Sequence, residues 1–398
     1  MAATHRFIAT SAFGTEDALV RELRTLGIHR TKPGKGHVRF SGDLRAGYTA
    51  CLWSRVASRV FLVIAQFEAM DADTLYQGLL DTDWRVHMRS KGTLWIDFVG
   101  GSRQIRDERF GAQRTKDAIC DQFRTFTGNR PSISQHAPDL RLRVHLRDGL
   151  VTVSVDLSGQ PLHMRSPSRA TGRAPLRETL AAAVLWYADW PKRAMRGEAL
   201  VDPMCGSGTF LKEAAGMALD LAPGLARTHW GFDRWSGHDR ALWAALRKEA
   251  EDRRAAKRQS MPVLKVVGSD IDGRAIQAAT RNLEAAGWAG DVDLTTCSVS
   301  NARPPDGAPG LVVVNPPYGQ RLEDDTQAQQ IHRMLGDSMR HHFLGWTVAV
   351  ITEHPLVGCV GLKPHRRIPI RNGALDCRLA MFDIAESAPT QRSPESSK

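Results

Sequence analysis

Four consecutive residues, Asn315-Pro316-Pro317-Tyr318, carry groups suited to chemistry on the exocyclic amine of a nucleobase. Such an amine is a weak nucleophile, because its lone pair is delocalised into the ring. The Asn315 side-chain oxygen and the Pro316 carbonyl are acceptors that would bind the amine hydrogens and draw the nitrogen toward tetrahedral geometry. Pro317 stiffens the loop, and the Tyr318 ring offers a surface on which a base can stack. We therefore predict that these four residues are catalytic.

A glycine-rich segment from Asp202 to Thr209 lies between a predicted strand and a predicted helix. Gly206 and Gly208 would let a small ligand approach the backbone and the helix N-terminus. A dinucleotide fingerprint needs a third glycine and an acid about 20 residues further on, whereas the next acid at a strand end, Asp270, comes 62 residues after Gly208. No Gly-Lys-Ser/Thr follows, as a P-loop requires. The segment therefore predicts a cofactor site that is neither an NAD site nor a P-loop.

Asp270 ends the second strand of the predicted sheet, where a carboxylate can accept hydrogen bonds from both hydroxyls of a ribose. Asp272 directly precedes a helix predicted from Arg274 and is expected to cap its N-terminus. These positions favour a cofactor that contains a ribose.

The elements that must position these residues alternate between strand and helix beyond Pro175. Short apolar runs predict strands at residues 199–202, 265–269, 292–296, 311–315 and 346–352. Helical spacing predicts helices at residues 176–187, 210–221, 274–286 and 326–342. Asn372-Gly373 predicts a hairpin that adds an antiparallel strand. This alternation is typical of a doubly wound, mostly parallel sheet.

The front half predicts smaller α+β units. Strands are expected at residues 5–9, 60–67 and 93–99, and helices at 15–26, 44–56 and 110–127. Asp148-Gly149 predicts a hairpin between strands at 141–146 and 151–156. Residues 158–175 are rich in Ser, Gly, Pro and Arg and are interpreted as a basic linker, and the polar tail from Ser387 is predicted to be disordered.

The 398 residues are 42% hydrophobic and 24% charged, which indicates a folded chain of two to three domains. The sequence has no apolar run long enough to cross a membrane and no secretory signal at its start, so a cytoplasmic protein without a membrane partner is expected. Six scattered cysteines without a CxxC pair predict neither a metal site nor a disulfide framework.

The positive charge is concentrated in the front half. Residues 1–175 contain 26 Lys and Arg against 17 Asp and Glu, whereas the remainder contains 28 against 26. An arginine-rich front half joined to a nearly neutral back half indicates that the front half binds a polyanion.

The three motifs of the back half resemble those of class I S-adenosylmethionine-dependent methyltransferases that act on amino nitrogens. Segments upstream, at residues 52–60, 116–119, 156–163 and 174–181, are similar to the THUMP-containing RNA methyltransferases. Residues 222–225, followed by Trp243, resemble the bacterial branch that makes N2-methylguanosine in large-subunit ribosomal RNA. The resemblance covers nearly the whole chain.

This resemblance implies an α/β fold with three domains. A ferredoxin-like domain is expected at residues 1–65, a THUMP RNA-binding domain at 66–158, a basic linker at 159–175, a Rossmann-like seven-stranded class I methyltransferase domain at 176–386 and a tail at 387–398. S-adenosyl-L-methionine is the implied cofactor. Structured RNA, above all large-subunit ribosomal RNA, is the implied partner of a monomeric protein.

The resemblance also implies site residues. Cofactor contacts are expected from Pro175, Glu178, Asp202, Pro203, Cys205, Gly206, Gly208, Thr209, Asp270, Ile271, Ser298 and Asn315. Ser298 stands where the family usually has an acid for the adenine amine. RNA contacts are expected from Arg55, Arg59, Arg114, Lys116, Arg165, Arg169 and Arg173.

The implied reaction is in-line methyl transfer to N2 of a flipped guanine in ribosomal RNA. A transfer RNA guanine-N2 methyltransferase, a DNA adenine-N6 methyltransferase and a non-catalytic RNA-binding assembly factor are alternatives. Some relatives carry a second methyltransferase domain that makes 7-methylguanosine; this chain stops at Lys398, so that activity is not expected.

Overall fold

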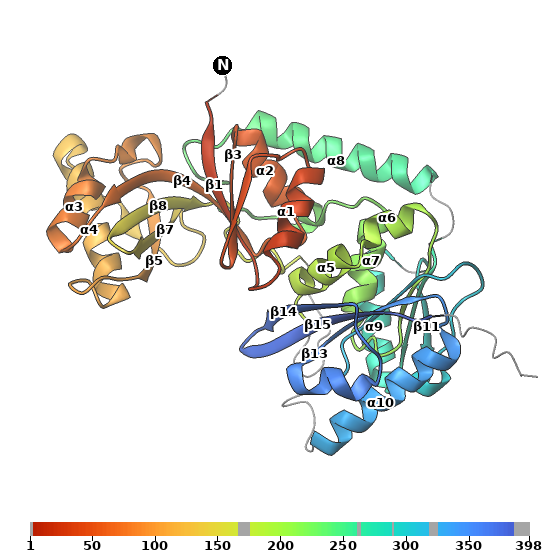
Figure 1. The fold of residues 1–398 in the computed structure, drawn as a ribbon. Coiled ribbons are helices and arrows are strands. Elements are labelled where there is room, and N and C mark those ends of the chain that lie inside the picture. Colours follow the sequence, from red (N-terminus) through yellow and green to blue (C-terminus); the bar gives the residue numbers. More distant parts are fainter. Residues whose placement is uncertain (1–2, 166–175, 261–263, 289, 318–324, 386–398) are drawn as a thin grey trace, which may run out of the picture. The chain divides into compact units, whose positions relative to one another are not determined.

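The computed structural model describes residues 3–165, 176–260, 264–288, 290–317 and 325–385. The chain forms two compact units (Figure 1). Met1–Pro167 and Leu221–Ala256 form the first unit, and Ser168–Asp220 and Lys257–Lys398 form the second. A segment inserted in the sequence of the back half therefore folds with the front half.

The first unit begins with a βαββαβ arrangement, as expected for a ferredoxin-like domain. Its elements are β1 (His5–Thr10), α1 (Glu16–Thr25), β2 (Thr31–Gly34), β3 (His37–Gly42), α2 (Leu44–Trp53) and β4 (Arg59–Glu68). The strands lie in the order β2-β3-β1-β4, and α1 and α2 lie beside β1 and β3 (Figure 1). The β2–β3 hairpin was not predicted, because β2 is a short edge strand that contains Pro33 and lacks apolar alternation.

The second part of this unit extends the same sheet. It contains α3 (Ala72–Leu80), β5 (Thr93–Gly100), α4 (Glu108–Thr127), β6 (Ser132–Ile133), β7 (Leu140–Arg147) and β8 (Leu150–Asp156). Because β4 pairs with β8, the eight strands form one sheet in the order β2-β3-β1-β4-β8-β7-β5-β6. The β7–β8 hairpin turns at Asp148 and Gly149, which adopt φ of 52° and 76°, as the Asp-Gly signal predicts.

Apolar side chains on one face of this sheet pack against the helices. On β1, Phe7 and Ala9 are buried, and the Phe7 ring stacks on Phe40 of β3 at 4.9 Å between centroids. A Cβ at Gly47 of α2 would lie 2.4 Å from the Phe7 ring. A glycine there allows the helix to approach the sheet closely.

The inserted segment packs on the first unit through aromatic side chains. It contains η2 (Pro223–Ala226) and the start of α8 (Arg240–Ser260). Tyr48 of α2 contacts Phe232 and Trp243, with ring centroids 4.7 and 5.6 Å apart, and its hydroxyl lies 2.6 Å from His238 Nδ1. This cluster explains why the segment belongs to the first unit.

The second unit contains a seven-stranded sheet in the order β11-β10-β9-β12-β13-β15-β14. Its strands are β9 (Leu200–Asp202), β10 (Val266–Asp270), β11 (Asp293–Thr296), β12 (Leu311–Val314), β13 (Thr347–Glu353), β14 (Arg366–Asn372) and β15 (Leu375–Asp383). Only β15 runs against its neighbours, β13 and β14. The expected Rossmann-like sheet with a terminal hairpin is thus confirmed.

Helices cover this sheet. They are α5 (Glu178–Tyr187), α6 (Trp190–Met195), α7 (Thr209–Ala218), α9 (Gly273–Ala285) and α10 (Asp325–His342). Leu335, Met339 and Phe343 follow one another at helical spacing and pack in the core with Val312 and Val314 of β12. Because the chain passes from β9 to β10 on one side and returns to β12 on the other, a crevice is expected at the carboxyl ends of β9 and β12.

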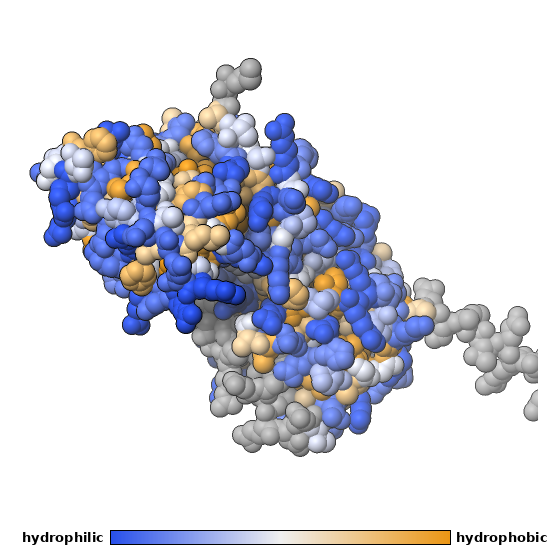
Figure 2. All heavy atoms as spheres, turned by 60° about the vertical axis from the view of Figure 1, so that its left-hand side comes forward, coloured by the Kyte–Doolittle hydropathy of each residue, from blue (hydrophilic) through white to orange (hydrophobic). Residues whose placement is uncertain are grey.

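One face of the molecule is largely hydrophilic. Hydrophilic side chains cover most of the face drawn in Figure 2, with hydrophobic ones scattered among them. Within the described part of the chain, we find no helix with both the length and the apolar character needed to cross a membrane.

Candidate active site

Three of the predicted motifs meet at one edge of the seven-stranded sheet. Asp202 ends β9, Asp270 ends β10, and Asn315 directly follows β12. Both β10 and β12 pair in parallel with β9, with Gly268 opposite Asp202 and Val312 opposite Val201. The carboxyl ends of these strands therefore bring the glycine loop, the strand-end acid and the Asn-Pro-Pro segment to the same edge of the sheet.

The glycine loop is fixed to β10 by backbone hydrogen bonds. The Cys205 amide donates to the Ser269 carbonyl at 2.9 Å, and the Gly206 amide donates to Asp270 Oδ2 at 2.9 Å. Gly208 caps α7 with a φ of 78°, a conformation that a side chain would strain. Thr209, the first residue of α7, is 7% exposed, and Pro203 is also buried. Burial raises the pKa of the Cys205 thiol, which disfavours its thiolate form.

Asp202 is a buried carboxylic acid in an unfavourable electrostatic setting. It is 1% exposed and accepts a hydrogen bond from the Met204 amide at 3.2 Å. Burial, followed by the nearby Asp270 carboxylate, raises its pKa well above the ordinary 3.8. Two carboxyl groups placed in this way favour a ligand that carries positive charge.

We expect Asp202→Asn to stabilise the cofactor-free protein at neutral pH. Because the pKa of Asp202 is raised on folding, ionisation disfavours the folded state as pH increases above 3.8, the ordinary value. An amide has the same shape and keeps an acceptor for Met204, but it carries no charge. The gain in melting temperature should therefore grow from pH 4 toward pH 8, as measured by thermal unfolding. A variant that melts below the parent at pH 8 would contradict this assignment.

The Asp270 carboxylate is oriented by two backbone amides. Oδ2 accepts from Gly206, and Oδ1 accepts from the Asp272 amide at 3.0 Å. Asp272 is the N-cap of α9, as predicted, and accepts from the Arg274 amide at 2.9 Å. Ile271, between the two acids, is 75% exposed. Its apolar side chain lies at the strand end where a flat ring could pack.

Asn315 has a buried acceptor that no described residue satisfies. The four residues of β12 before it are fully buried, and Asn315 Oδ1 is itself inaccessible and accepts no hydrogen bond from the described part of the chain. An unsatisfied buried acceptor costs about 1–3 kcal/mol. This atom therefore suits a ligand that donates a hydrogen bond. Pro316 is buried and Pro317 is half-buried, whereas Tyr318 lies outside the described residues.

Two of the remaining cofactor candidates, Glu178 and Ser298, lie among the described residues, and the third, Pro175, does not. Glu178 begins α5, is 2% exposed, and has Oε1 3.3 Å from Lys212 Nζ of α7. Ser298 caps the short helix η3 (Val299–Asn301), where its hydroxyl accepts from the Ser300 amide at 3.4 Å. Sequence reasoning missed Lys212, because nothing local indicates a partner 34 residues earlier.

Two of the arginines that were predicted to bind RNA are buried in the first unit. Arg55 and Arg165 are each 7% exposed. Arg55 Nη2 donates to the Leu221 carbonyl, and Arg165 Nη2 donates to the Arg55 carbonyl, both at 2.5 Å. Their guanidinium groups satisfy buried carbonyls where segments of the first unit meet, so they do not face an RNA.

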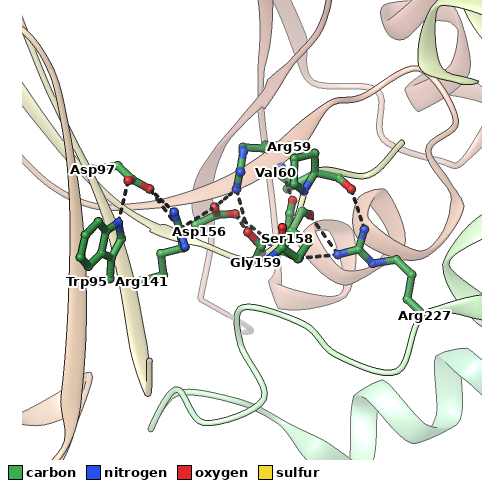
Figure 3. Close-up of polar contacts among 11 residues, drawn as sticks. Arg59, Val60, Trp95, Asp97, Arg141, Asp156, Ser158, Gly159 and Arg227 are labelled. Atoms are coloured by element: carbon green, nitrogen blue, oxygen red, sulfur yellow. Dashed lines mark hydrogen bonds and ion pairs between the residues drawn. The ribbon is translucent and has the colours of Figure 1, made fainter. Parts of the chain in front are cut away.

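Arg59 also acts within the fold (Figure 3). It forms an ion pair with Asp156, which is 1% exposed, and donates to the Gly159 carbonyl at 2.8 Å. Asp156 in turn accepts from the Ser158 amide at 2.9 Å, and Arg227 of the inserted segment donates to the Ser158 carbonyl at 2.9 Å. Burial raises the pKa of Asp156, and Arg59 opposes that shift. The chain of contacts fixes the end of β8.

The other predicted basic contacts are partly exposed or undescribed. Arg114 pairs with Asp73 at 2.8 Å and lies 4.2 Å from the centroid of the Tyr76 ring, while Lys116 pairs with Asp117 at 3.2 Å. Their side chains are 30% and 27% exposed, and their role toward RNA stays a prediction. Arg169 and Arg173 lie outside the described residues.

The residues that the structure describes contain no candidate metal site. Among them, no group of three or more His, Cys, Asp or Glu side chains is arranged to hold an ion.

Comparison with known families decides the class of the chain. Residues 165–381 match the model of the RMKL-like methyltransferase domain. The chain belongs to the RMKL-like methyltransferase family. The front half of the chain matches an RlmL ferredoxin-like domain at residues 6–61 and a THUMP domain at 69–156.

Individual relatives agree with this assignment. The chain is 43% identical over 386 residues to the ribosomal RNA large subunit methyltransferase K/L of Methylococcus capsulatus, and 42% identical over 387 residues to that of Pseudomonas aeruginosa. The alignments cover 97% and 96% of this chain but 52% and 53% of those proteins. The chain thus spans about half the length of the curated relatives it matches.

Solved structures share the whole fold. A possible methylase from Clostridium difficile 630 is 28% identical, with a TM-score of 0.87 over 97% of this chain and 100% of that one. A methyltransferase solved in complex with SAH is 26% identical, with a TM-score of 0.84 over 98% and 100% of the two chains.

Proposed function

We propose that this methyltransferase transfers a methyl group from S-adenosylmethionine to the exocyclic N2 of a guanine in large-subunit ribosomal RNA. The observation that carries the proposal is the buried Oδ1 of Asn315, which has no hydrogen-bond partner among the described residues and lies at the sheet edge that also holds the glycine loop. The names of the relatives support ribosomal RNA as the substrate, and the bound SAH of the solved neighbour supports the cofactor.

The residues at the crevice fit this cofactor. The backbone at Gly206 leaves room for close approach, since a Cβ built there would have no heavy atom within 4 Å apart from its chain neighbours. Asp270 offers an oriented carboxylate for the ribose hydroxyls, and the exposed Ile271 side chain offers an apolar surface for the adenine. The buried Asp202 favours the positive charge of the methionine end. When bound, the cofactor supplies a methyl group on a sulfonium, which is already electrophilic.

The contribution of the chain to the reaction is positioning. Asn315 Oδ1 and the Pro316 carbonyl would accept the two hydrogens of the guanine amine, which orients the nitrogen lone pair toward the methyl group. The new nitrogen–carbon bond would form as the carbon–sulfur bond of the sulfonium breaks, leaving a neutral thioether, and the methylated nitrogen would then lose one proton to solvent. A base inside a helix cannot reach such a crevice, so the guanine must be flipped out or presented in a single strand. Acceptors that select an amine exclude a ring nitrogen or a hydroxyl as the target.

The substrate is tested by incubating the purified protein with labelled S-adenosylmethionine and three separate pools. These are protein-free large-subunit ribosomal RNA from a strain lacking the gene, total transfer RNA, and DNA. Digestion to nucleosides should give labelled N2-methylguanosine from the ribosomal RNA pool alone. If the transfer RNA pool were labelled instead, transfer RNA and not ribosomal RNA would be the substrate. Label on adenine of DNA would refute the guanine assignment. RNA binding without label in any pool would indicate an assembly factor.

A further inference from the structure

One face of the eight-stranded sheet carries cationic side chains instead of helices. Side chains alternate along its strands, so Arg6 of β1, Arg39 of β3 and Arg143 of β7 point away from the core that holds Phe7 and Val144. They line a hollow of about 890 Å³. The basic residues around it are Arg6, Arg30, Lys32, Lys35, His37, Arg39, Arg143, His145 and Arg147.

Strand register makes this set continuous from the ferredoxin-like domain into the THUMP domain. Lys32 of β2 lies opposite Arg39 of β3. Across the middle of the sheet, Arg6 lies opposite Val63 of β4, Val63 opposite Ser154 of β8, and Ser154 opposite Arg143 of β7. Six adjacent strands separated by about 4.8 Å span about 24 Å. The face is thus wide enough to lie along a helical or folded nucleic acid.

The positive charge on this face is partly compensated at β7, where Arg143 lies opposite Asp97 of β5 and interacts with Asp156, but much less so at β1, β2 and β3. Asp148 is the one acid among the residues that line the hollow, and it pairs with Arg147 at 3.3 Å. In the described part of the chain, Lys32 and Arg39 form no ion pair, and Arg6 donates to the neutral Gln66 at 2.9 Å. The pKa of His145 is lowered by burial and then by cations that include Arg143. Cations held together in this way favour a polyanion.

The aromatic residues of the hollow are not available to stack on bases. Phe7, Phe40 and Phe61 are 1%, 3% and 2% exposed, and the Arg143 guanidinium lies over the Phe61 ring at 5.2 Å from its centroid. A surface that offers guanidinium and ammonium groups without open rings binds phosphates, which are common to every RNA sequence. The face therefore suits the backbone of an RNA rather than its bases.

We propose that this face, defined by Arg6, Lys32, Arg39, Arg143 and His145, docks the phosphate backbone of the substrate RNA. The inference rests on the proposed function for its choice of RNA as the polyanion. It replaces the buried Arg55 and Arg165 as the basic surface of the front half. Sequence selection then falls to the methyltransferase unit, because phosphate contacts position an RNA without identifying it.

The test compares two triple variants of the full chain by fluorescence anisotropy with a labelled RNA hairpin at several salt concentrations. The test variant is Arg6→Gln/Lys32→Gln/Arg39→Gln. The control is Arg24→Gln/Arg124→Gln/Lys248→Gln, which removes the same charge from α1, α4 and α8. The test variant should bind about tenfold or more weakly at physiological salt, and its log–log salt slope should be smaller by about 2–3, about one per lost phosphate contact. The control should stay close to the parent.

Equal losses in the two variants would overturn the proposal. A charge-preserving variant, Arg6→Lys/Lys32→Arg/Arg39→Lys, should bind RNA like the parent, and weak binding by this variant with an unchanged melting temperature would also overturn it. Methyl transfer by the parent protein to ribosomal RNA is measured separately. Its absence would refute the proposed function, whereas the binding comparison alone decides whether this face docks RNA.

Discussion

Asn315→Ala is expected to reduce the turnover of methyl transfer by about 10²–10³-fold while the dissociation constant for S-adenosylmethionine changes little. The variant removes the buried Oδ1 that has no partner in the described chain. Without this oxygen, the guanine amine loses one hydrogen-bond acceptor, and its lone pair is no longer aligned with the methyl group. Single-turnover kinetics with saturating RNA would measure the loss, and isothermal titration would measure cofactor affinity.

A second variant separates the effect of a smaller side chain from the effect of losing the hydrogen-bond acceptor. Asn315→Asp keeps the shape and the acceptor but introduces a charge in a buried position, so it should retain more activity than alanine only where the carboxyl group is protonated or stabilised by the amine. If the Ala variant kept near-parental turnover, the catalytic role assigned to Asn315 would be wrong. Loss of cofactor binding in that variant would instead indicate that Asn315 acts mainly through the cofactor contact that the resemblance implies.

Asp270→Ala should raise the dissociation constant for S-adenosylmethionine by about 100-fold. The carboxylate is oriented by the amides of Gly206 and Asp272, and hydrogen bonds to a charged group contribute about 1.5–3 kcal/mol each. Two ribose hydroxyls lost together therefore account for a change of this size. Isothermal titration gives the constant directly, and turnover at saturating cofactor should recover much of the parental rate.

Asp272→Ala is the matched control for that variant. It removes a carboxylate two residues away whose hydrogen bond caps α9. Loss of an N-cap destabilises a protein by about 1 kcal/mol, which lowers the melting temperature without touching the ribose site. If both variants weakened cofactor binding equally, the effect would come from the loop after β10 and not from an Asp270 contact.

The sequence predicts the seven-stranded sheet and the order of its motifs well, for a physical reason. Strands such as Leu311–Val314 are buried on both faces, so their apolar runs stand out, and Asp202, Asp270 and Asn315 follow such runs directly. Parallel strands place their carboxyl ends at one edge, and the meeting of the three motifs follows from topology. What could not be predicted is the hydrogen bonding of individual atoms, such as Asn315 Oδ1, which is buried and has no partner in the part of the chain that the structure describes.

The basic residues show where prediction from sequence fails. An arginine in a basic segment looks the same whether it faces solvent or satisfies a buried carbonyl, and Arg55 and Arg165 do the latter across distances of 166 and 110 residues. The better signal was present in β7, where Arg141, Arg143, His145 and Arg147 alternate with Leu142, Val144 and Leu146. A period of two places a row of cations on one face of a sheet.

The position of the inserted segment sets an order of folding during synthesis. Tyr48 of α2 needs Phe232 and Trp243 as neighbours, and the close approach of Gly231 to Asp156 completes the end of β8. These partners leave the ribosome only after the first strand and helix of the methyltransferase unit have been translated. The nascent front half must therefore keep an aromatic surface uncovered for that interval, and a fragment ending at the linker would retain that surface permanently and be prone to aggregate.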